Sequence, residues 1–139
     1  MKSAKRSITE LILEAVPEAI AWKDVNSIYK GANTQFAKAA GFNSAEDIIG
    51  KTDDQLSWKK FANEYKASDR QVLKSGTPIL NQIEFFHRTD APDLWLELSQ
   101  LPLIEDDGEA VGILIVFRDI SQDMKDKQDL HAAKNEAIE

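Results

Sequence analysis

The sequence predicts an α+β domain with one five-stranded antiparallel sheet and short helices on one face. Two short strand-like runs near the N-terminus precede a helical middle section, and three longer strand-like runs follow that section. Turn-rich stretches at 88–93 and 105–109 join the later runs, which favours hairpins between consecutive strands. A helical stretch precedes the first strand and another follows the last, so the sheet is flanked by helices.

Composition and charge limit the classes of function. The chain has 139 residues, which is enough for one domain with a core, and its formal net charge is -7. This charge argues against nucleic acid and against direct contact with an anionic membrane. The sequence has no Cys, which excludes disulfides and thiolate metal sites. We expect a cytoplasmic chain, since neither a signal peptide nor an apolar run of about 18 residues occurs, so any membrane anchor would lie outside it.

The first expected element is an N-terminal helix. Ser7 and Glu10 have the spacing of a capping box, and Pro17 ends the helical pattern. Apolar residues recur at helical spacing between these points. They are Ile8, Leu11, Ile12 and Ala15. Because a monomer would leave this stripe exposed, we expect it to form the interface of a homodimer.

A hairpin and several helices are expected next. The runs "AIAWKD" (19–24) and "SIYKGA" (27–32) read as two short strands around a turn. Asn33, Ser44 and Thr52 then stand where caps of three short helices are expected. A longer helix is predicted over roughly 58–75, followed by glycine and proline.

Three strands complete the predicted sheet as an antiparallel meander. They are expected over 79–87, 94–103 and 110–118. The last run is apolar on both of its faces, so both faces of the sheet need a cover. The helices of the middle section can cover one face, and the N-terminal helix or a second subunit can cover the other.

Several apparent catalytic or nucleotide motifs are better explained structurally. The "GKT" at 50–52 lacks the preceding glycine of a phosphate-binding loop, because Ala45 occupies that place. The acidic pairs at 53–54 and 106–107 stand where caps and turns favour aspartate. No nucleophile is accompanied by a base, so we expect no enzyme activity from this chain.

Imidazole and carboxylate chemistry offers little more. His87 and His131 have no second histidine or cysteine to complete a metal site, so we expect no metal. Asp69 is unusual, because it lies on the apolar stripe of the long helix. A carboxylate there must find hydrogen bonds or a counter-charge, or take up a proton. We expect a structural bond to a loop backbone, with contact to a ligand as the alternative.

Aromatic residues are expected to converge between the sheet and the helices, either as plain core or as the wall of a ligand cavity. The candidate ligand-binding residues are Trp22, Tyr29, Phe36, Trp58, Tyr65, Asp69, Phe85 and Trp95. Phe61 belongs to the same aromatic group.

Several stretches together resemble the PAS family of sensor domains, from about Leu11 to Gln122. The most specific are "GKTDDQL" and "RDIS", and "AIAWKD" and "GANTQFAKAAGF" also match. The resemblance implies an N-terminal helix at 1–16, a PAS core at 17–119 and a linker helix at 120–139. It further implies a pocket between the sheet and the helices.

The family likeness also implies where a signal leaves the sheet. Asp119, Ile120 and Ser121 match the junction between the last strand and an output helix. Their chemistry agrees with this role, because Asp119 and Ser121 can cap the following helix while Ile120 anchors it.

The final stretch, "LHAAKNEAIE", resembles the helix that leads into the output domain of hybrid and other sensor histidine kinases. The resemblance therefore implies a sensory fragment of such a kinase, with its own kinase domain as a partner. Two alternatives remain: the input domain of a cyclic-dinucleotide signalling protein, and a ligand-free PAS module for dimerisation.

The same resemblance restricts the cofactor. Flavin-linked light sensors of the family use a cysteine, which this chain lacks, and haem-binding members use a histidine on the long helix, where 58–75 has none. It thus argues against a covalent flavin adduct and against histidine-ligated haem. A small organic ligand, a non-covalent flavin or an empty pocket remains.

Overall fold

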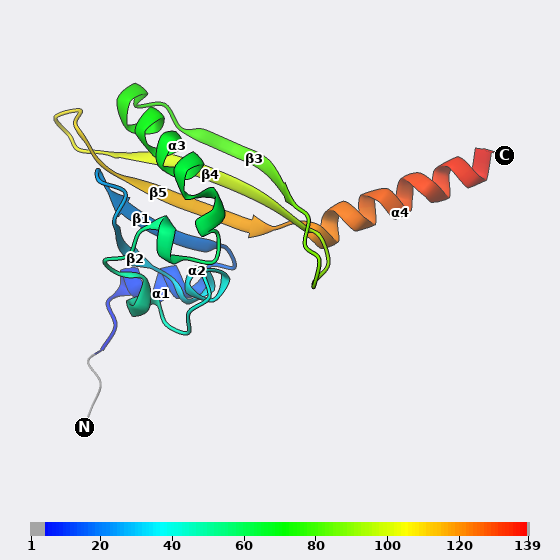
Figure 1. Cartoon of the computed structure of the whole chain (residues 1–139), viewed down its shortest axis with the longest axis horizontal. Helices are drawn as coiled ribbons and strands as arrows, with labels where there is room; N and C mark the ends of the chain where they lie inside the picture. Colours follow the sequence, from blue (N-terminus) through cyan, green and yellow to red (C-terminus); the bar gives the residue numbers. More distant parts are fainter. Residues whose placement is uncertain (1–4, 139) are drawn as a thin grey trace.

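The computed structural model describes residues 5–138 and shows a five-stranded antiparallel sheet with helices packed on one face (Figure 1). The strand order is β2-β1-β5-β4-β3, and every neighbouring pair is antiparallel. The strands are β1 (Ala19–Asp24), β2 (Tyr29–Ala32), β3 (Ile79–Phe86), β4 (Leu94–Ile104) and β5 (Ala110–Asp119). The predicted fold class is therefore confirmed.

Four α-helices and three 3₁₀ turns complete the described part of the chain. They are α1 (Ile8–Ala15), α2 (Thr34–Ala39), η1 (Ala45–Ile48), η2 (Asp53–Gln55), η3 (Lys59–Phe61), α3 (Ala62–Ser75) and α4 (Ser121–Ile138). The helix predicted over 58–75 is wrong in its first turn, because η3 precedes α3 there. Trp58 and Phe61 have backbone angles outside the α-helical region, so they separate the two segments.

Asn33 fixes the relative positions of three elements. Its Oδ1 accepts hydrogen bonds from the Phe36 and Ile20 backbone N–H groups, each at 3.0 Å. Its Nδ2 donates to the carbonyl oxygens of Leu13 (2.9 Å) and Glu18 (2.8 Å). One buried side chain therefore caps α2, and it also holds the end of α1 and the start of β1.

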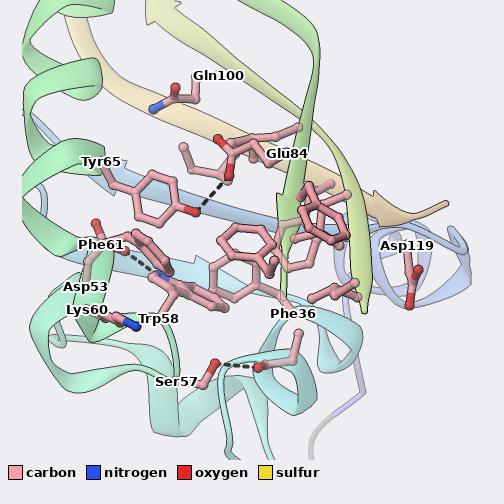
Figure 2. A pocket seen from close by; sticks show the side chains of 18 of the residues that line it. Phe36, Asp53, Ser57, Trp58, Lys60, Phe61, Tyr65, Glu84, Gln100 and Asp119 are labelled. Atoms are coloured by element: carbon pink, nitrogen blue, oxygen red, sulfur yellow. Dashed lines mark hydrogen bonds between the residues drawn. The ribbon is translucent and has the colours of Figure 1, made fainter. Parts of the chain in front are cut away.

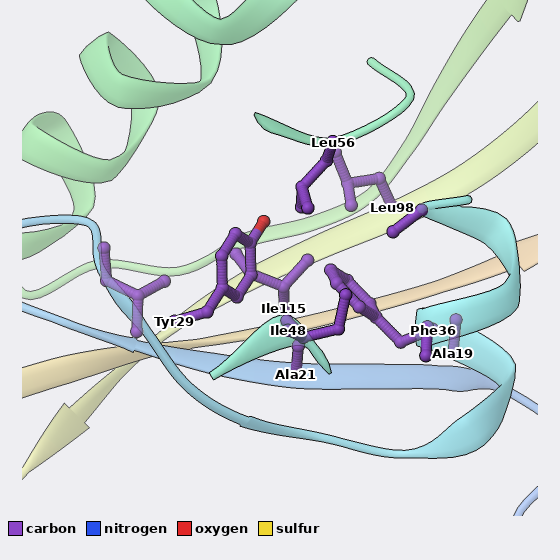
Figure 3. Close-up of a cluster of buried hydrophobic side chains, with 11 residues drawn as sticks. Ala19, Ala21, Tyr29, Phe36, Ile48, Leu56, Leu98 and Ile115 are labelled. Atoms are coloured by element: carbon purple, nitrogen blue, oxygen red, sulfur yellow. The ribbon is translucent and has the colours of Figure 1, made fainter. Parts of the chain in front are cut away.

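The core lies between the covered face of the sheet and the helical layer (Figure 3). Strand alternation places small residues of β1 on this face, so the larger side chains of the helical layer can pack closely against the sheet. The labelled members of this buried cluster are Ala19, Ala21, Tyr29, Phe36, Ile48, Leu56, Leu98 and Ile115.

The opposite face of the sheet keeps apolar residues in contact with solvent. Ile83 is 47% exposed and Phe85 is 48% exposed. The N-terminal helix does not cover them, because α1 lies beside the start of α2, where the Thr34 backbone N–H donates to Glu14 at 3.0 Å. Its apolar stripe is exposed as well, with Ile8 at 70%. The homodimer interface stays a prediction.

Helix α4 begins directly after β5 and extends away from the sheet (Figure 1). Its first turn begins with a hydrogen bond from the Met124 N–H to the Ile120 carbonyl, at 2.9 Å. None of the helices within residues 5–138 has the length and apolar character needed to cross a membrane.

Candidate functional site

A cavity of about 650 Å³ lies between the sheet and the helical layer (Figure 2). This volume is in the range of small-molecule sites in proteins. The cavity is lined by residues from all five strands and from α2, η2, η3 and α3. Because the sheet forms one wall and the helices form the other, a bound molecule would touch both layers.

Aromatic rings form much of the cavity wall. Phe36 packs against Trp58 and Phe117, with ring centroids 5.3 and 5.5 Å apart. Phe61 and Phe86 make a second contact at 5.3 Å in an edge-to-face arrangement. All five residues line the cavity. The wall is therefore suited to a flat, largely apolar molecule.

A buried ion cluster, formed by Lys23, Asp53 and Asp69, closes one side of this region. The Lys23 Nζ lies 2.8 Å from Asp53 Oδ2 and 2.7 Å from Asp69 Oδ2. All three side chains are at most 2% exposed. The cluster joins β1, η2 and α3, so it ties the helical layer to the sheet.

Asp53 receives two further hydrogen bonds. The Tyr29 hydroxyl donates to its Oδ1 at 2.5 Å, and the Trp58 indole N–H donates to the same oxygen at 2.8 Å. Burial, together with the neighbouring Asp53 and Asp69 carboxylates, raises the pKa of Tyr29 well above its usual value. Tyr29 therefore stays protonated and remains a donor.

Asp69 accepts its hydrogen bonds from side chains and not from a loop backbone. Besides Lys23, the Ser27 hydroxyl and the Gln100 amide each donate to it at 2.9 Å. The expectation of a loop-backbone bond is therefore wrong. The physical reason is that Lys23 and Gln100 lie on the covered face of the sheet, directly opposite the apolar stripe of α3.

The Tyr65–Glu84 pair bridges α3 and β3 across the cavity (Figure 2). The Tyr65 hydroxyl donates to Glu84 Oε2 at 3.0 Å, and both side chains are half-buried. Burial raises the pKa of Glu84, and the hydrogen bond from Tyr65 partly offsets this. The pKa of Tyr65 is raised as well, first by burial and then by the Glu84 charge.

The predicted site residues separate into two groups. Tyr29, Phe36, Trp58, Tyr65 and Phe85 border the cavity. The other three candidates, Trp22, Asp69 and Trp95, are not part of its lining. The expectation that all the aromatic residues converge on the helical side is therefore wrong for both tryptophans.

Strand alternation explains these two corrections. Trp22 follows the buried Ala21 in β1 and so lies on the opposite face, where its ring covers Gly31 so closely that a Cβ there would come within 2.0 Å of it. The Trp95 ring packs on the Phe85 ring, with centroids 4.7 Å apart. Phe85 pairs with Trp95 in the register of β3 and β4 and follows Glu84, so both rings lie on the face away from α3. Phe85 nevertheless borders the cavity, because β3 is the edge strand of the sheet on that side.

The polar lining residues that the sequence does not predict include Lys23, Glu84 and Asp53. Lys23 and Glu84 alternate with outward-facing residues, so strand periodicity is the signal that could have found them. Asp53 was expected to serve only as a cap. No cluster of potential metal ligands occurs within the described residues, and His87 lies 2.8 Å from Asp93 through its Nδ1.

The junction residues connect the cavity wall to α4. The Ile120 N–H donates to the Trp95 carbonyl, and the Ser121 hydroxyl accepts from the Trp95 N–H, both at 2.9 Å. The Asp119 carboxylate accepts from the Ser121 N–H at 2.8 Å. Ile120 is buried. Two hydrogen bonds to Trp95 therefore hold the start of α4 against the beginning of β4. Leu94 and Leu96, the neighbours of Trp95 in β4, line the cavity.

Known proteins similar to this chain include sensors and sensor domains. The C4-dicarboxylate transport sensor protein DctS of Rhodobacter capsulatus is 26% identical over 137 residues, which is 97% of this chain and 20% of DctS. A phage VqmA–DPO complex matches with a TM-score of 0.72 and 21% identity, over 91% of this chain and 58% of that one. A sensory box sensor histidine kinase from Vibrio cholerae matches with a TM-score of 0.58 and 15% identity, over 82% and 90% of the two chains.

These similarities differ in what they establish. The structural matches show the fold alone, and the chain spans only about a fifth of the length of DctS. The family model described as the PAS fold matches residues 13–124, which include the whole sheet, the cavity and the junction. This chain therefore belongs to the PAS family of sensory domains.

Proposed function

We propose that this chain is the input domain of a sensor histidine kinase, and that it binds a small organic ligand in the cavity and transmits binding to α4. The observation that carries the proposal is the continuity between the cavity wall and the junction. Ile115 and Phe117 of β5 line the cavity, and the same strand leads within three residues to Ile120. A displacement of this wall has a short covalent path to the output helix.

Neighbouring strand β4 offers a second path. Leu94 and Leu96 line the cavity, while Trp95 between them holds Ile120 and Ser121 by backbone and hydroxyl hydrogen bonds. A ligand that moves these leucines would therefore change the two bonds at Trp95. Because α4 starts at Ser121, its direction depends on those bonds.

Two relatives support parts of this proposal. The phage VqmA structure is a complex with DPO, so a protein of the same fold holds a small molecule. The Vibrio cholerae protein is a sensor histidine kinase, which supports a kinase as the output partner, as does the linker resemblance of the last ten residues.

The ligand-binding step is tested by filling the cavity. Protein purified from its host is examined by native mass spectrometry, and metabolites are then screened by thermal shift. Leu96→Trp adds volume inside the cavity and should abolish the ligand-induced increase in Tm. Leu80→Trp is the matched control, because Leu80 is 55% exposed outside the cavity. If no compound is retained and none raises Tm, or if the increase persists in Leu96→Trp, the proposal fails.

Transmission is tested by amide hydrogen exchange. Ligand should change the exchange rates of the Ile120 and Trp95 amides, since both form the bonds that hold α4. Ser121→Ala removes one of these bonds and should speed exchange at Trp95 in the ligand-free protein. Gln122→Ala, at the exposed position that follows Ser121, serves as the control. Unchanged exchange at both amides on ligand binding would contradict transmission through this junction.

A further inference from the structure

Charges around the cavity are unequal in sign. The buried ion cluster contributes two carboxylates but one ammonium group, and Glu84 adds a third carboxylate to the interior. The cationic lining residues Lys60 and Arg88 are exposed, so solvent and salt screen their charges. The interior is therefore unfavourable for an anionic molecule and favourable for a cationic one.

Hydrogen bonding distinguishes the three carboxylates. Asp53 and Asp69 each accept three hydrogen bonds from neighbouring side chains. The Lys23 ammonium is shared between them and is not available to bind an anion. Glu84 accepts one hydrogen bond, from Tyr65 to Oε2, and its Oε1 has no hydrogen-bonding partner in the described part of the chain. Glu84 is thus the carboxylate able to receive a further donor.

Aromatic rings lie next to this open carboxylate oxygen. A second hollow of about 290 Å³ adjoins the main cavity and is lined by Glu84 and Tyr65 together with Phe61, Phe86 and the acidic Glu64. The two phenyl rings contact each other edge to face, so they can receive a third ring. A protonated nitrogen near their faces would gain a cation–π attraction as well as the charge of Glu84.

We propose that the cavity selects a small aromatic amine, whose protonated nitrogen binds Glu84 and whose ring packs against Phe61 and Phe86. This inference rests on the proposed ligand-sensing function and names the ligand class. It also separates the chain from a sensor of dicarboxylates, because a dianion would meet a net negative interior whose buried ammonium, that of Lys23, is already shared between Asp53 and Asp69. Burial of Glu84, which raises its pKa, agrees with a site whose carboxylate gains from a cationic partner.

Four probes of similar size test the charge preference by isothermal titration at neutral pH. They are phenethylamine, 2-phenylethanol, 3-phenylpropionate and succinate. Phenethylamine should bind at least about tenfold more tightly than the alcohol, since only the amine carries a charge that Glu84 attracts. The two anions should not bind. Equal or tighter binding of the alcohol or of either anion would overturn the proposal.

A variant identifies the carboxylate responsible. Glu84→Gln keeps the shape and an acceptor for Tyr65, so it should fold, which circular dichroism checks. It should weaken phenethylamine binding about tenfold or more and leave 2-phenylethanol binding unchanged. Glu105→Gln, in the exposed β4–β5 turn, should change neither. An amine affinity that is the same in Glu84→Gln would contradict the proposed contact.

The outcomes separate this inference from the function on which it rests. If the alcohol or an anion binds in a way that Leu96→Trp abolishes, the cavity is a ligand site and only the amine preference is wrong. If none of the four probes binds and the wider screen finds no compound, both the amine preference and the ligand-sensing function are wrong.

Discussion

The buried ion cluster and the Tyr65–Glu84 pair both join α3 to the sheet, but they satisfy their charged groups differently. Lys23, Asp53 and Asp69 are at most 2% exposed, and each carboxylate is surrounded by donors. Tyr65 and Glu84 are half-buried and share a single hydrogen bond. A saturated charge cluster holds the fold, whereas a partly satisfied carboxylate facing a cavity is able to recognise a ligand.

The difference has an energetic basis. Burying ions costs desolvation energy, and attraction between them repays it only when the geometry is good and every remaining group is hydrogen-bonded. The ion cluster meets this condition, because no buried side-chain polar atom in the described residues lacks a partner. Its main effect is to specify where η2 and α3 lie on the sheet. The Tyr65–Glu84 pair retains solvent contact, so less is lost when it changes.

Removing the lysine should give the largest effect. Lys23→Met leaves Asp53 and Asp69 buried without their shared cation, and we expect a loss of about 3–5 kcal/mol in the free energy of unfolding, measured by urea denaturation. Lys30→Met is the control on the next strand. Its ion pair with Asp24 spans 3.5 Å and its side chain is 54% exposed, so the loss should stay below about 1 kcal/mol. Equal losses in both variants would contradict the prediction that the buried ion cluster contributes more to stability than the exposed ion pair does.

Local sequence signals are sufficient to predict the sheet and most helix starts. The capping box of Ser7 and Glu10 and the cap at Asn33 depend on residues three positions apart, and both are present. The first turn of the long helix is different, because the Trp58 side chain is fixed by a bond to Asp53. That hydrogen bond depends on how η2 packs beside Trp58, so helical periodicity in the sequence does not reveal it.

The ion cluster could not be predicted, because its members are distant in sequence. Lys23 is 30 residues from Asp53 and 46 from Asp69. The position of Asp69 on an apolar stripe indicates that it needs a partner, but not which one. Alternation along β1 places Lys23 on the face of Ala21, and this is the one signal that indicates burial of the lysine.

A matched pair of substitutions, with expected effects of intermediate size, tests the comparison between the buried ion cluster and the Tyr65–Glu84 pair. Tyr29→Phe and Tyr65→Phe remove the same hydroxyl group from the two regions. Tyr29→Phe deprives the buried Asp53 of a donor and should cost about 1.5–3 kcal/mol in unfolding free energy, while Tyr65→Phe should cost about 1 kcal/mol or less, since water can replace the hydroxyl at Glu84. Chemical denaturation of the two variants side by side measures this. A larger cost at Tyr65 would reverse the assignment of the two regions.

The smallest expected change in stability is that of Glu84→Gln, and its size depends on pH. Burial raises the pKa of Glu84 above its ordinary value of 4.5, despite the hydrogen bond from Tyr65. A raised carboxyl pKa means that the folded state binds the proton more tightly than the unfolded state does. The stability that this group contributes is therefore complete below pH 4.5 and is lost as the pH rises through the folded-state pKa.

Glutamine does not titrate, and it still offers Tyr65 an acceptor. At neutral pH Glu84→Gln should therefore be as stable as the unmodified domain or more stable by about 0.5 kcal/mol or less, and this difference should disappear in acid. Denaturation curves collected across the pH range measure the difference, with Glu64 on α3 as the nearby carboxylate to replace in parallel. A variant that is clearly less stable at neutral pH would mean that the Glu84 charge is held as firmly as that of Asp69. Glu84 would then have a structural role, and its carboxylate would not be available to bind an amine.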